Sequence, residues 1–407
     1  MASIFAGIEV GPKIEVFALN KLYQEDSSPF KVNLGVGAYR TADGRPWVLP
    51  VVKKTEIQIA ESLDINHEYL PVCGPDSFTK ASVSLLLGED SPAIKENRAH
   101  GMQALSGTGA LRVGAEFLVT RLGRSVVYYS DPTWENHHKV FAAAGFTDLR
   151  TYRYWNPKTR AVDFDGFIED LQNAPENAII ILHACAHNPT GCDPTQEQWQ
   201  HIADVMKSRK LFPFFDSAYQ GFASGDPIRD AFAVRYFVSR GFELFCAQSY
   251  AKNFGLYCER VGNLTVVHKD ATTTIAVISQ LTLIVRAMYS NPPAFGGRIV
   301  DTILNSSELK KEWYECIKIM SSRIIKMRKA LYDELIRLET PGTWNHIIDQ
   351  IGMFSYTGLN EKQVQLLINE FHIYLLKTGR ISMCGLNENN VAHVAKAIHT
   401  AVTTIPN

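Results

Sequence analysis

The sequence predicts an α/β fold: a large domain whose mostly parallel sheet is flanked by helices, and a smaller α+β domain joined to it by a long helix. Short apolar runs without polar alternation recur along the chain, and amphipathic helix patterns lie between them. Such runs are typical of strands buried on both faces, and strands that alternate with helices form parallel sheets with right-handed crossovers. One long helix pattern then marks a different arrangement in the last third.

Five apolar runs predict strands of the large domain, at residues 125–130, 178–183, 211–215, 244–248 and 264–268. Two helix patterns lie between them. The first places four apolar side chains on one helical face: Leu111, Ala115, Leu118 and Leu122. The second begins at Thr195, which can cap a helix that has Gln198 at its third position. It continues with three apolar side chains on one face: Trp199, Ile202 and Met206.

The C-terminal third contains one long helix pattern. From Glu308 to Leu338, apolar residues recur every three or four positions without an internal proline or glycine, and the pattern ends before Pro341. By pattern alone, the N-terminal segment could belong to either domain. We expect an N-terminal arm at residues 1–14, a small domain at 15–45 and 318–407, and a large domain at 46–317.

The 407-residue chain has 41 Lys+Arg and 42 Asp+Glu, a net charge of −1. A nucleic-acid partner usually requires a basic excess or stripe, which this sequence lacks. The seven cysteines are scattered, odd in number and without a CxxC pair, which indicates reduced thiols in a reducing compartment. The sequence has no pattern of a secretion signal or transit peptide and no run of 18 apolar residues. We therefore expect a cytoplasmic protein without a membrane span.

Polar residues that directly follow the apolar runs are the candidates for a site, because ligands of open α/β sheets bind beyond the carboxyl ends of the strands. Asn188 follows one run, and Asp216 with Tyr219 follows the next. The segment SYAK (249–252) follows the third. A glycine-rich turn, SGTG (106–109), opens a helix and offers amide groups to a phosphate.

Each candidate also has an ordinary structural explanation. The glycine-rich turn has no Walker GK[ST], and Arg112 occupies the third glycine position of GxGxxG, so the turn is either a phosphate site or a plain tight turn. Asp216 is either a helix cap or a charge aimed at a ligand cation. Lys252 is either a desolvated Schiff-base nucleophile with a lowered pKa or a surface lysine whose stem lies on apolar groups.

Two other chemistries are disfavoured. His183 and His187 would lie ~13 Å apart in an extended strand at about 3.3 Å per residue. That is too far to share a zinc ion, and no third ligand has a suitable spacing, so we expect no metal. The fragments SxxK (249–252), KTG (377–379) and YxN (154–156) imitate the acyl-serine penicillin-binding set, but their order is wrong and SxxK ends a strand run.

In their joint order and spacing, several segments resemble the fold-type I pyridoxal-phosphate aminotransferase family, from about residue 28 to the C-terminus. The segments are KVNLGVGAYR (31–40), NHEYLP (66–71), SDPTWENH (130–137), LHACAHNPTG (182–191), FPFFDSAYQGFASGD (212–226), SYAKNFGLYCERVGNLTVV (249–267), SNPP (290–293), TPGTWNHIIDQIGMFSYTGL (340–359) and GRISMCGL (379–386). The resemblance implies reversible amino transfer between L-aspartate and 2-oxoglutarate, giving oxaloacetate and L-glutamate. It also implies pyridoxal 5'-phosphate as cofactor, with pyridoxamine 5'-phosphate in the half-reaction.

The resemblance implies a cofactor role for individual residues. Lys252 is similar to the lysine that binds the cofactor aldehyde and moves a proton, and Asp216 to the partner of the ring N–H. Tyr219 and Asn188 resemble the pair that hydrogen-bonds the ring hydroxyl oxygen, and His137 would lie behind Asp216. The other implied cofactor contacts are Trp134 on the ring, Ser106, Gly107, Thr108, Ser249 and Arg260 at the phosphate, and Tyr69 from a neighbouring subunit.

The resemblance also implies how a dicarboxylic substrate is held. Arg380 would bind the α-carboxylate, and Arg286 of a neighbouring subunit the distal carboxylate, since the guanidinium fork matches a carboxylate and a neutral substrate would leave a buried charge unpaired. Gly37 would allow the backbone to approach the substrate, and Trp134 and Asn188 complete the predicted substrate contacts. These roles imply a homodimer with shared active sites.

Some positions depart from the family pattern. Ala251 stands where serine is usual and Ser382 where asparagine is common, and the loop between Arg121 and Ser125 is short. Two alternatives therefore stay open: a protein that binds the ligands without turnover, and a transaminase specific for aromatic or sulfur amino acids.

Overall fold

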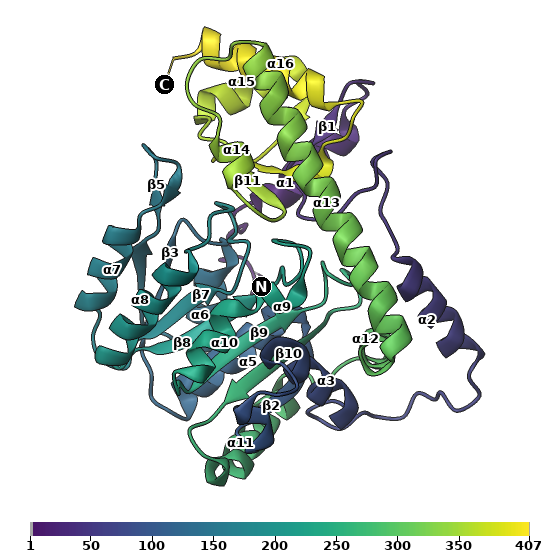
Figure 1. Cartoon of the computed structure of the whole chain (residues 1–407), viewed down its shortest axis with the longest axis vertical. Helices are drawn as coiled ribbons and strands as arrows, with labels where there is room; N and C mark the ends of the chain where they lie inside the picture. Colours follow the sequence, from purple (N-terminus) through teal and green to yellow (C-terminus); the bar gives the residue numbers. More distant parts are fainter. Residues whose placement is uncertain (1–2, 407) are drawn as a thin grey trace.

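A seven-stranded sheet forms the centre of the larger part of the molecule in the computed structural model, which describes residues 3–406 (Figure 1). Strand β10 pairs antiparallel with β2 and β9, and the other neighbours pair in parallel. The predicted α/β class with a mostly parallel sheet is therefore confirmed. In sheet order the strands are β2 (Ala99–Leu105), β10 (Val261–Val267), β9 (Leu244–Ser249), β8 (Phe212–Ser217), β7 (Ile179–His183), β3 (Val126–Asp131) and β4 (Asp148–Arg153).

The apolar runs located the five inner strands, within three residues at each end. The prediction missed β2 and β4, the two strands at the sheet edges. Strand β2 contains His100, Gly101 and Gln103, and three of the six residues of β4 (DLRTYR) are charged. Edge strands tolerate polar residues because one side of their backbone stays unpaired. Their sequences therefore contain no continuous apolar segment that would predict a strand.

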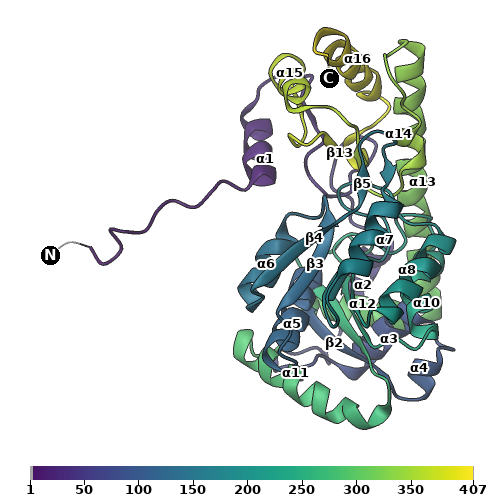
Figure 2. The same ribbon diagram turned by 90° about the vertical axis from the view of Figure 1, so that its left-hand side faces the viewer.

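Helices cover both faces of the sheet, and the strand side chains divide between two cores. Ile179 and Ile181 of β7 pack with α5 (Ser106–Thr120), α6 (Asn136–Ala144) and α11 (Thr274–Met288). Ile180 and Leu182 pack on the opposite face with α3 (Asp76–Leu87), α7 (Phe164–Asn173), α8 (Gln196–Ser208) and α10 (Phe232–Ser239). Figure 2 shows the helices on either side of the sheet. Burial on both faces explains why the inner strands show no polar alternation.

Two helix predictions had different outcomes. Helix α8 begins after Thr195, whose hydroxyl accepts from the Gln198 amide while the Gln198 side chain bonds back to Thr195, so the predicted capping box is confirmed. Helix α5 ends at Thr120, however, and Leu122 lies beyond it with an exposed side chain. The prediction that Leu122 belongs to the apolar face was wrong because the chain turns at Gly123, which has a positive φ of 63°.

Helix α13 (Ser307–Arg337) runs from the sheet into the upper part of the molecule (Figure 1), which confirms the predicted long helix within one residue at each end. The upper part contains α1 (Glu15–Glu25), α14 (His346–Asp349), α15 (Glu361–Phe371) and α16 (Val391–Thr404). It also contains two strand pairs, β1 (Val32–Asn33) with β12 (Ile373–Tyr374) and β11 (Phe354–Tyr356) with β13 (Arg380–Ser382). The remaining elements are α2 (Pro50–Glu61), α4 (Pro92–Lys95), β5 (Trp155–Asn156), β6 (Ala161–Val162), α9 (Pro227–Asp230), α12 (Ala294–Asn305) and the 3-10 turns at Ala271–Thr273 and Met383–Gly385.

The domain division at residues 14, 45 and 317 stays a prediction. The parallel pairing of β1 with β12 supports it, because that pairing joins the segment before residue 45 to the C-terminal third. Residues 1–2 of the predicted arm and residue 407 of the predicted small domain lie outside the described residues.

Within residues 3–406, one helical stretch, Ala271–Met288, is long and apolar enough by length and composition to cross a membrane. The sequence, which has no run of 18 apolar residues, predicts no membrane span. One such stretch is weak evidence of a span. Only 22% of it is buried within the chain, so it presents an apolar surface on the outside of the sheet layer.

Candidate active site

A cavity of about 220 Å³ lies at the carboxyl ends of the inner strands. Asp216 belongs to the end of β8, Ser249 is the last residue of β9, and Asn188 follows β7. The parallel direction of β7, β8 and β9 brings these three strand ends to one edge of the sheet. Of the predicted site residues, those that line the cavity are Ser106, Gly107, Thr108, Trp134, Asn188, Asp216, Tyr219, Ser249, Lys252 and Arg260.

Several hydrogen-bond donors lie close together at one end of the cavity. Ser106 is the first residue of α5 and has a positive φ of 63°, and its hydroxyl lies 2.9 Å from that of Ser249. A Cβ on Gly107 would come within 3.1 Å of the Ser249 Cβ, so glycine permits the close approach of α5 to β9. The free amides of the helix start, the two hydroxyls and the exposed guanidinium of Arg260 together form a site suited to a phosphate.

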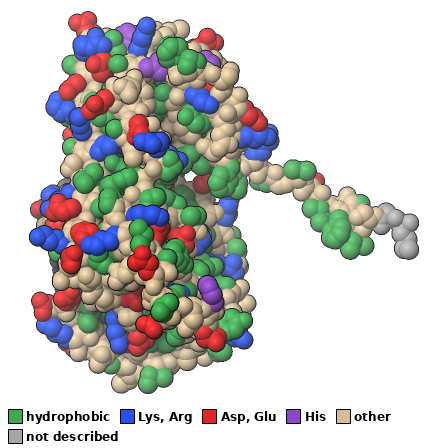
Figure 3. Space-filling model, turned by 90° about the vertical axis from the view of Figure 1, so that its right-hand side faces the viewer, with side chains coloured by type: hydrophobic (Ala, Val, Ile, Leu, Met, Phe, Trp, Pro, Cys, Tyr) green, Lys and Arg blue, Asp and Glu red, His purple; other side chains and the backbone are tan. Residues whose placement is uncertain are grey.

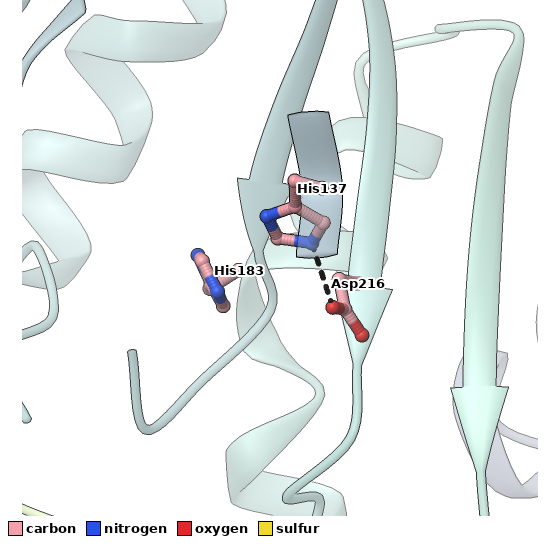
Figure 4. A group of neighbouring side chains, drawn as sticks. All are labelled: His137, His183 and Asp216. Carbon is pink, nitrogen blue, oxygen red and sulfur yellow. Dashed lines mark hydrogen bonds and ion pairs between the residues drawn. The ribbon is translucent and has the colours of Figure 1, made fainter. Parts of the chain in front are cut away.

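The opposite end holds a buried carboxylate. Oδ2 of Asp216 lies 3.0 Å from Nε2 of His137 (Figure 4). Nδ1 of His137 lies 2.8 Å from the Thr133 hydroxyl. Burial opposes ionisation of Asp216, but the hydrogen bond and charge of His137, together with His183 and Lys252, lower its pKa below the usual value. An ionised carboxylate in a buried site can hold a cationic N–H of a ligand ring.

The prediction that His183 and His187 lie far apart was wrong, because their ring centroids are 4.1 Å apart. Strand β7 ends at His183, Ala186 has a positive φ of 50°, and the Gly191 amide donates to the His187 carbonyl, so the chain turns back instead of continuing extended. His183 also stands near His137 and Asp216, with ligand atoms of all three within 4.8 Å. Both ring nitrogens of His183 are buried without a partner among the described residues.

Lys252 lies between the two ends of the cavity. Burial lowers the pKa of its ammonium to about 8, although the charge of Asp216 partly opposes this shift. Its Nζ stands 5.0 Å from the ring centroid of Tyr219 and has no carboxylate within 4.0 Å among residues 3–406. A lysine in these surroundings is unprotonated far more often than a surface lysine, so it can act as a nucleophile toward an aldehyde or as a base.

Arg380 is buried beside this cavity. Its Nη2 donates to the Gly35 carbonyl at 2.6 Å and its Nη1 to Oδ1 of Asn188 at 3.4 Å. Within the described chain no carboxylate lies within 4.0 Å of it, and its Nε is buried without a partner. Gly37 lies close by, where a Cβ would come within 3.0 Å of the Phe354 ring. A buried guanidinium with unused donors is suited to a ligand carboxylate.

Four predicted site residues do not line the cavity of this chain: Arg380 and Gly37 lie beside it, whereas Tyr69 and Arg286 are exposed. The side chain of Tyr69 is 82% exposed. Arg286 is exposed at the end of α11, and its guanidinium donates to the Ser290 hydroxyl. The sequence reasoning also missed Phe354, whose ring lies against Arg380 and Tyr219. Phe354 sits in a family-like segment, MFSYTGL (353–359), but an aromatic residue in an apolar strand carries no signal of its own.

These side chains fit pyridoxal phosphate: a donor-rich end for the phosphate, an ionised carboxylate for the ring nitrogen, and a lysine of lowered pKa for the aldehyde. The fold and the site therefore define a pyridoxal-phosphate enzyme of fold type I. Residues 29–398 match the family Aminotransferase class I and II, and the chain belongs to that family.

The chain is similar to relatives over its whole length. It is 58% identical to the cytoplasmic aspartate aminotransferase of Gallus gallus and 56% identical to that of Caenorhabditis elegans, with 99% of each chain covered in both pairs. The aspartate aminotransferase from Saccharomyces cerevisiae cytoplasm superposes with a TM-score of 0.96 at 45% identity, covering 98% of this chain and 99% of the other. An aromatic-amino-acid aminotransferase from Burkholderia pseudomallei, covalently bound to pyridoxal phosphate, superposes with a TM-score of 0.96 at 41% identity, covering 98% and 100%.

Proposed function

We propose that this protein is a cytoplasmic aspartate aminotransferase, which interconverts L-aspartate and 2-oxoglutarate with oxaloacetate and L-glutamate. The observation that carries the proposal is the buried guanidinium of Arg380, which has no carboxylate partner in the described chain and bonds to Asn188 at the edge of the Lys252 cavity. Full-length identity of 52–58% to four named aspartate aminotransferases supports the same activity.

In this proposal, residues at and after the strand ends contact different parts of the cofactor. When bound, pyridoxal phosphate supplies an electron sink that allows a substrate amino acid to lose its Cα proton. Lys252 would hold the cofactor through its aldehyde, and its amine would be the group that accepts and returns the Cα proton of the substrate. Asp216 would pair with the ring nitrogen and favour its protonated form, because its carboxylate is stabilised as an anion. Tyr219 and Asn188 would donate hydrogen bonds to the ring hydroxyl oxygen, and Trp134 would pack against the ring.

The phosphate is assigned to the opposite end of the cavity. The amides and hydroxyls of Ser106, Gly107 and Thr108, the Ser249 hydroxyl and the Arg260 guanidinium provide both hydrogen bonds and positive charge. Holding the phosphate there would leave the ring nitrogen free to pair with Asp216.

We further propose a homodimer in which each active site receives Tyr69 and Arg286 from the partner. Both side chains are exposed in this chain and away from its own cavity. The extended N-terminal arm projects from the body (Figure 3), and its exposed apolar side chains include Ile4, Phe5, Ile8 and Val10. Helix α11, which ends beside Arg286, also exposes Ile275 and Leu283. A second copy would cover these apolar surfaces and complete both sites.

A second candidate function is amino transfer from aromatic amino acids, which the similarity to the aromatic-amino-acid aminotransferase favours. Arg286 argues for dicarboxylates, because an aromatic side chain would leave that charge without a partner. The two functions share Arg380 and differ only at the distal end of the substrate.

Steady-state assays of the holoenzyme with L-aspartate and with L-phenylalanine, each with 2-oxoglutarate, test the proposal. We expect kcat/KM to favour aspartate by about 100-fold or more, since phenylalanine would leave the distal arginine unpaired. A preference for phenylalanine would establish the second function, and no turnover with either would indicate a binding protein.

A further inference from the structure

Phe354 touches three groups that the proposed function uses, although it donates no hydrogen bond to any of them. The Arg380 guanidinium carbon lies 4.2 Å from the centroid of its ring. The ring of Tyr219 stands edge-on at 5.8 Å and 82°. A Cβ on Gly37 would come within 3.0 Å of the ring. The ring is buried, so it fills the space between the carboxylate-binding arginine and the cofactor-binding tyrosine.

The contact between Phe354 and Arg380 follows from strand register. In the antiparallel pair β11–β13, Phe354 lies opposite Ser382 and Tyr356 lies opposite Arg380. Phe354 and Arg380 are therefore diagonal neighbours on one face, a spacing that long and aromatic side chains bridge. The guanidinium carbon lies over the ring, whose negative face attracts a cation.

A second buried arginine holds the backbone of the segment that carries Phe354. Arg328, in the middle of α13, donates from Nη1 to the Ile347 carbonyl and from Nη2 to the Gly352 carbonyl, each at 2.9 Å. Nη2 also donates to the carbonyl of Phe354 itself. Among the described residues it has no carboxylate within 4.0 Å, and burial lowers its pKa to about 10. Both terminal nitrogens of the guanidinium therefore bind the chain between residues 347 and 354, and its Nε is buried without a partner among the described residues.

Arg380 needs such support because its own hydrogen bonds do not fix the orientation of its guanidinium. It has two, to Gly35 and Asn188, and the bond to Asn188 is long at 3.4 Å. A bidentate contact with a carboxylate requires a defined plane for the guanidinium. The flat ring of Phe354 fixes that plane from one side.

We propose that Phe354 is a positioning residue that holds Arg380 ready for the substrate α-carboxylate, and that Arg328 positions Phe354 through its backbone. This inference rests on the proposed function of Arg380. If it is correct, replacing Phe354 should weaken only the binding of the α-carboxylate. KM should then rise by the same factor for all substrates that have an α-carboxylate, whatever their distal group.

The main test compares Phe354→Leu with Phe354→Tyr in the holoenzyme. We expect Phe354→Leu to raise KM for L-aspartate and for L-phenylalanine by the same factor, about five- to tenfold, with kcat changed less than about twofold. Phe354→Tyr, which keeps the ring, should restore KM. Phe167→Leu is the matched control, because Phe167 is a buried phenylalanine on α7 whose ring stacks on Tyr152 of β4, and it should leave KM unchanged. Equal KM values for Phe354→Leu and wild type would overturn the proposal.

Two further measurements separate positioning from general loosening of the fold. The binding of 3-aminopropanoate, which is L-aspartate without its α-carboxylate, is followed by the change in cofactor absorbance and should change less than about twofold in Phe354→Leu. A double-mutant cycle with Arg380→Lys should show strong coupling, so that Phe354→Leu has little further effect once the guanidinium is gone. Additive effects, or an equal loss of 3-aminopropanoate binding, would refute a role through Arg380.

Arg328→Met tests the backbone anchor. It should raise KM in the same pattern as Phe354→Leu, while the absorbance of the bound cofactor stays unchanged. If Arg328→Met does not fold, Arg328→Lys, which keeps the charge but not the fork, is measured instead, and an unchanged KM there would contradict the anchoring step. Arg380→Lys in the wild-type background separates the two hypotheses. If this variant leaves KM unchanged, the proposed function of Arg380 is wrong. If it raises KM while Phe354→Leu does not, only the role of Phe354 is wrong.

Discussion

The hydrogen bond between His137 and Asp216 determines which ring nitrogen of His137 is the donor and favours the ionised form of Asp216. Oδ2 of Asp216 lies 3.0 Å from Nε2 of His137, and both side chains are buried (Figure 4). An ionised carboxylate only accepts hydrogen bonds, so Nε2 is the donor. This leaves Nδ1 of His137 to accept from the Thr133 hydroxyl at 2.8 Å whenever the ring is neutral. The carboxylate is thereby stabilised as an anion in a place where burial alone would raise its pKa.

Removing this hydrogen bond should shift the acid limb of activity. The pKa of Asp216 is lowered in the folded protein, so the anion is present above that pKa and is lost as the pH falls through it. His137→Phe removes the donor and leaves burial unopposed, which raises the pKa of Asp216. We expect the acid limb of kcat/KM to move to higher pH, while the rate at the plateau falls less than in Asp216→Asn. An acid limb at the wild-type pH would show that His137 does not tune this carboxylate.

Replacement of Lys252 tests the group that moves the proton. Lys252→Ala removes both the nucleophile and the base, so kcat should fall by about 10³-fold or more. Borohydride reduction of the wild-type holoenzyme should attach the cofactor covalently to the peptide that contains residue 252, as read by mass spectrometry, and the variant should show no such adduct. Lys310→Ala, a lysine on α13 away from the cavity, is the control. Retained turnover in Lys252→Ala would refute the assigned role.

The pH dependence of cofactor capture should report the lowered pKa of Lys252. Burial lowers this pKa to about 8. The unprotonated amine attacks an aldehyde, so the rate at which the apoprotein captures pyridoxal phosphate should rise with pH and level off above about pH 8. Stopped-flow absorbance at a fixed cofactor concentration measures this rate. A rate that keeps rising to pH 10 would place the lysine in water instead.

Ala251 offers a substitution that should strengthen cofactor binding. It lines the cavity, and its amide donates to the Ser249 hydroxyl at 3.2 Å, so a side-chain hydroxyl there would add a donor near the phosphate end. We expect Ala251→Ser to lower the dissociation constant of pyridoxal phosphate about fivefold, the worth of one hydrogen bond of about 1 kcal/mol. Equilibrium titration of the apoprotein measures it, and pyridoxal, which lacks the phosphate, is the control ligand. Equal gains for both ligands would argue against a phosphate contact.

Local sequence patterns predicted the inner strands, which are buried on both faces, and the capped helix α8. Inner strands buried on both faces are continuously apolar, and α8 carries its capping box in two residues, Thr195 and Gln198. The edge strands β2 and β4 left no such signal, because an unpaired edge tolerates polar residues. The approach of His183 to His187 depends on a turn after β7, which no spacing rule for a strand contains.

Local patterns did not predict the functional roles of the site residues. Asp216 and Lys252 each had an ordinary explanation in isolation, and only the resemblance to a family gave them roles. Phe354 was missed because its contact with Arg380 requires the register of two strands separated by 23 intervening residues of chain. Long-range pairing of that kind is not encoded in any local pattern.

Mixing two inactive variants tests whether Lys252 and Arg286 serve the same site from different subunits. If they do, a hybrid dimer of Lys252→Ala with Arg286→Ala carries both changes in one site and neither in the other. Random exchange makes half of the dimers hybrids with one intact site each, so the mixture should recover roughly a quarter of wild-type activity toward aspartate. If each chain used its own Arg286, every site in the hybrid would carry one change and nothing would be recovered. The exposed position of Arg286, away from its own cavity, favours recovery. Unmixed variants taken through the same exchange are the control, because they exclude activation by the procedure itself.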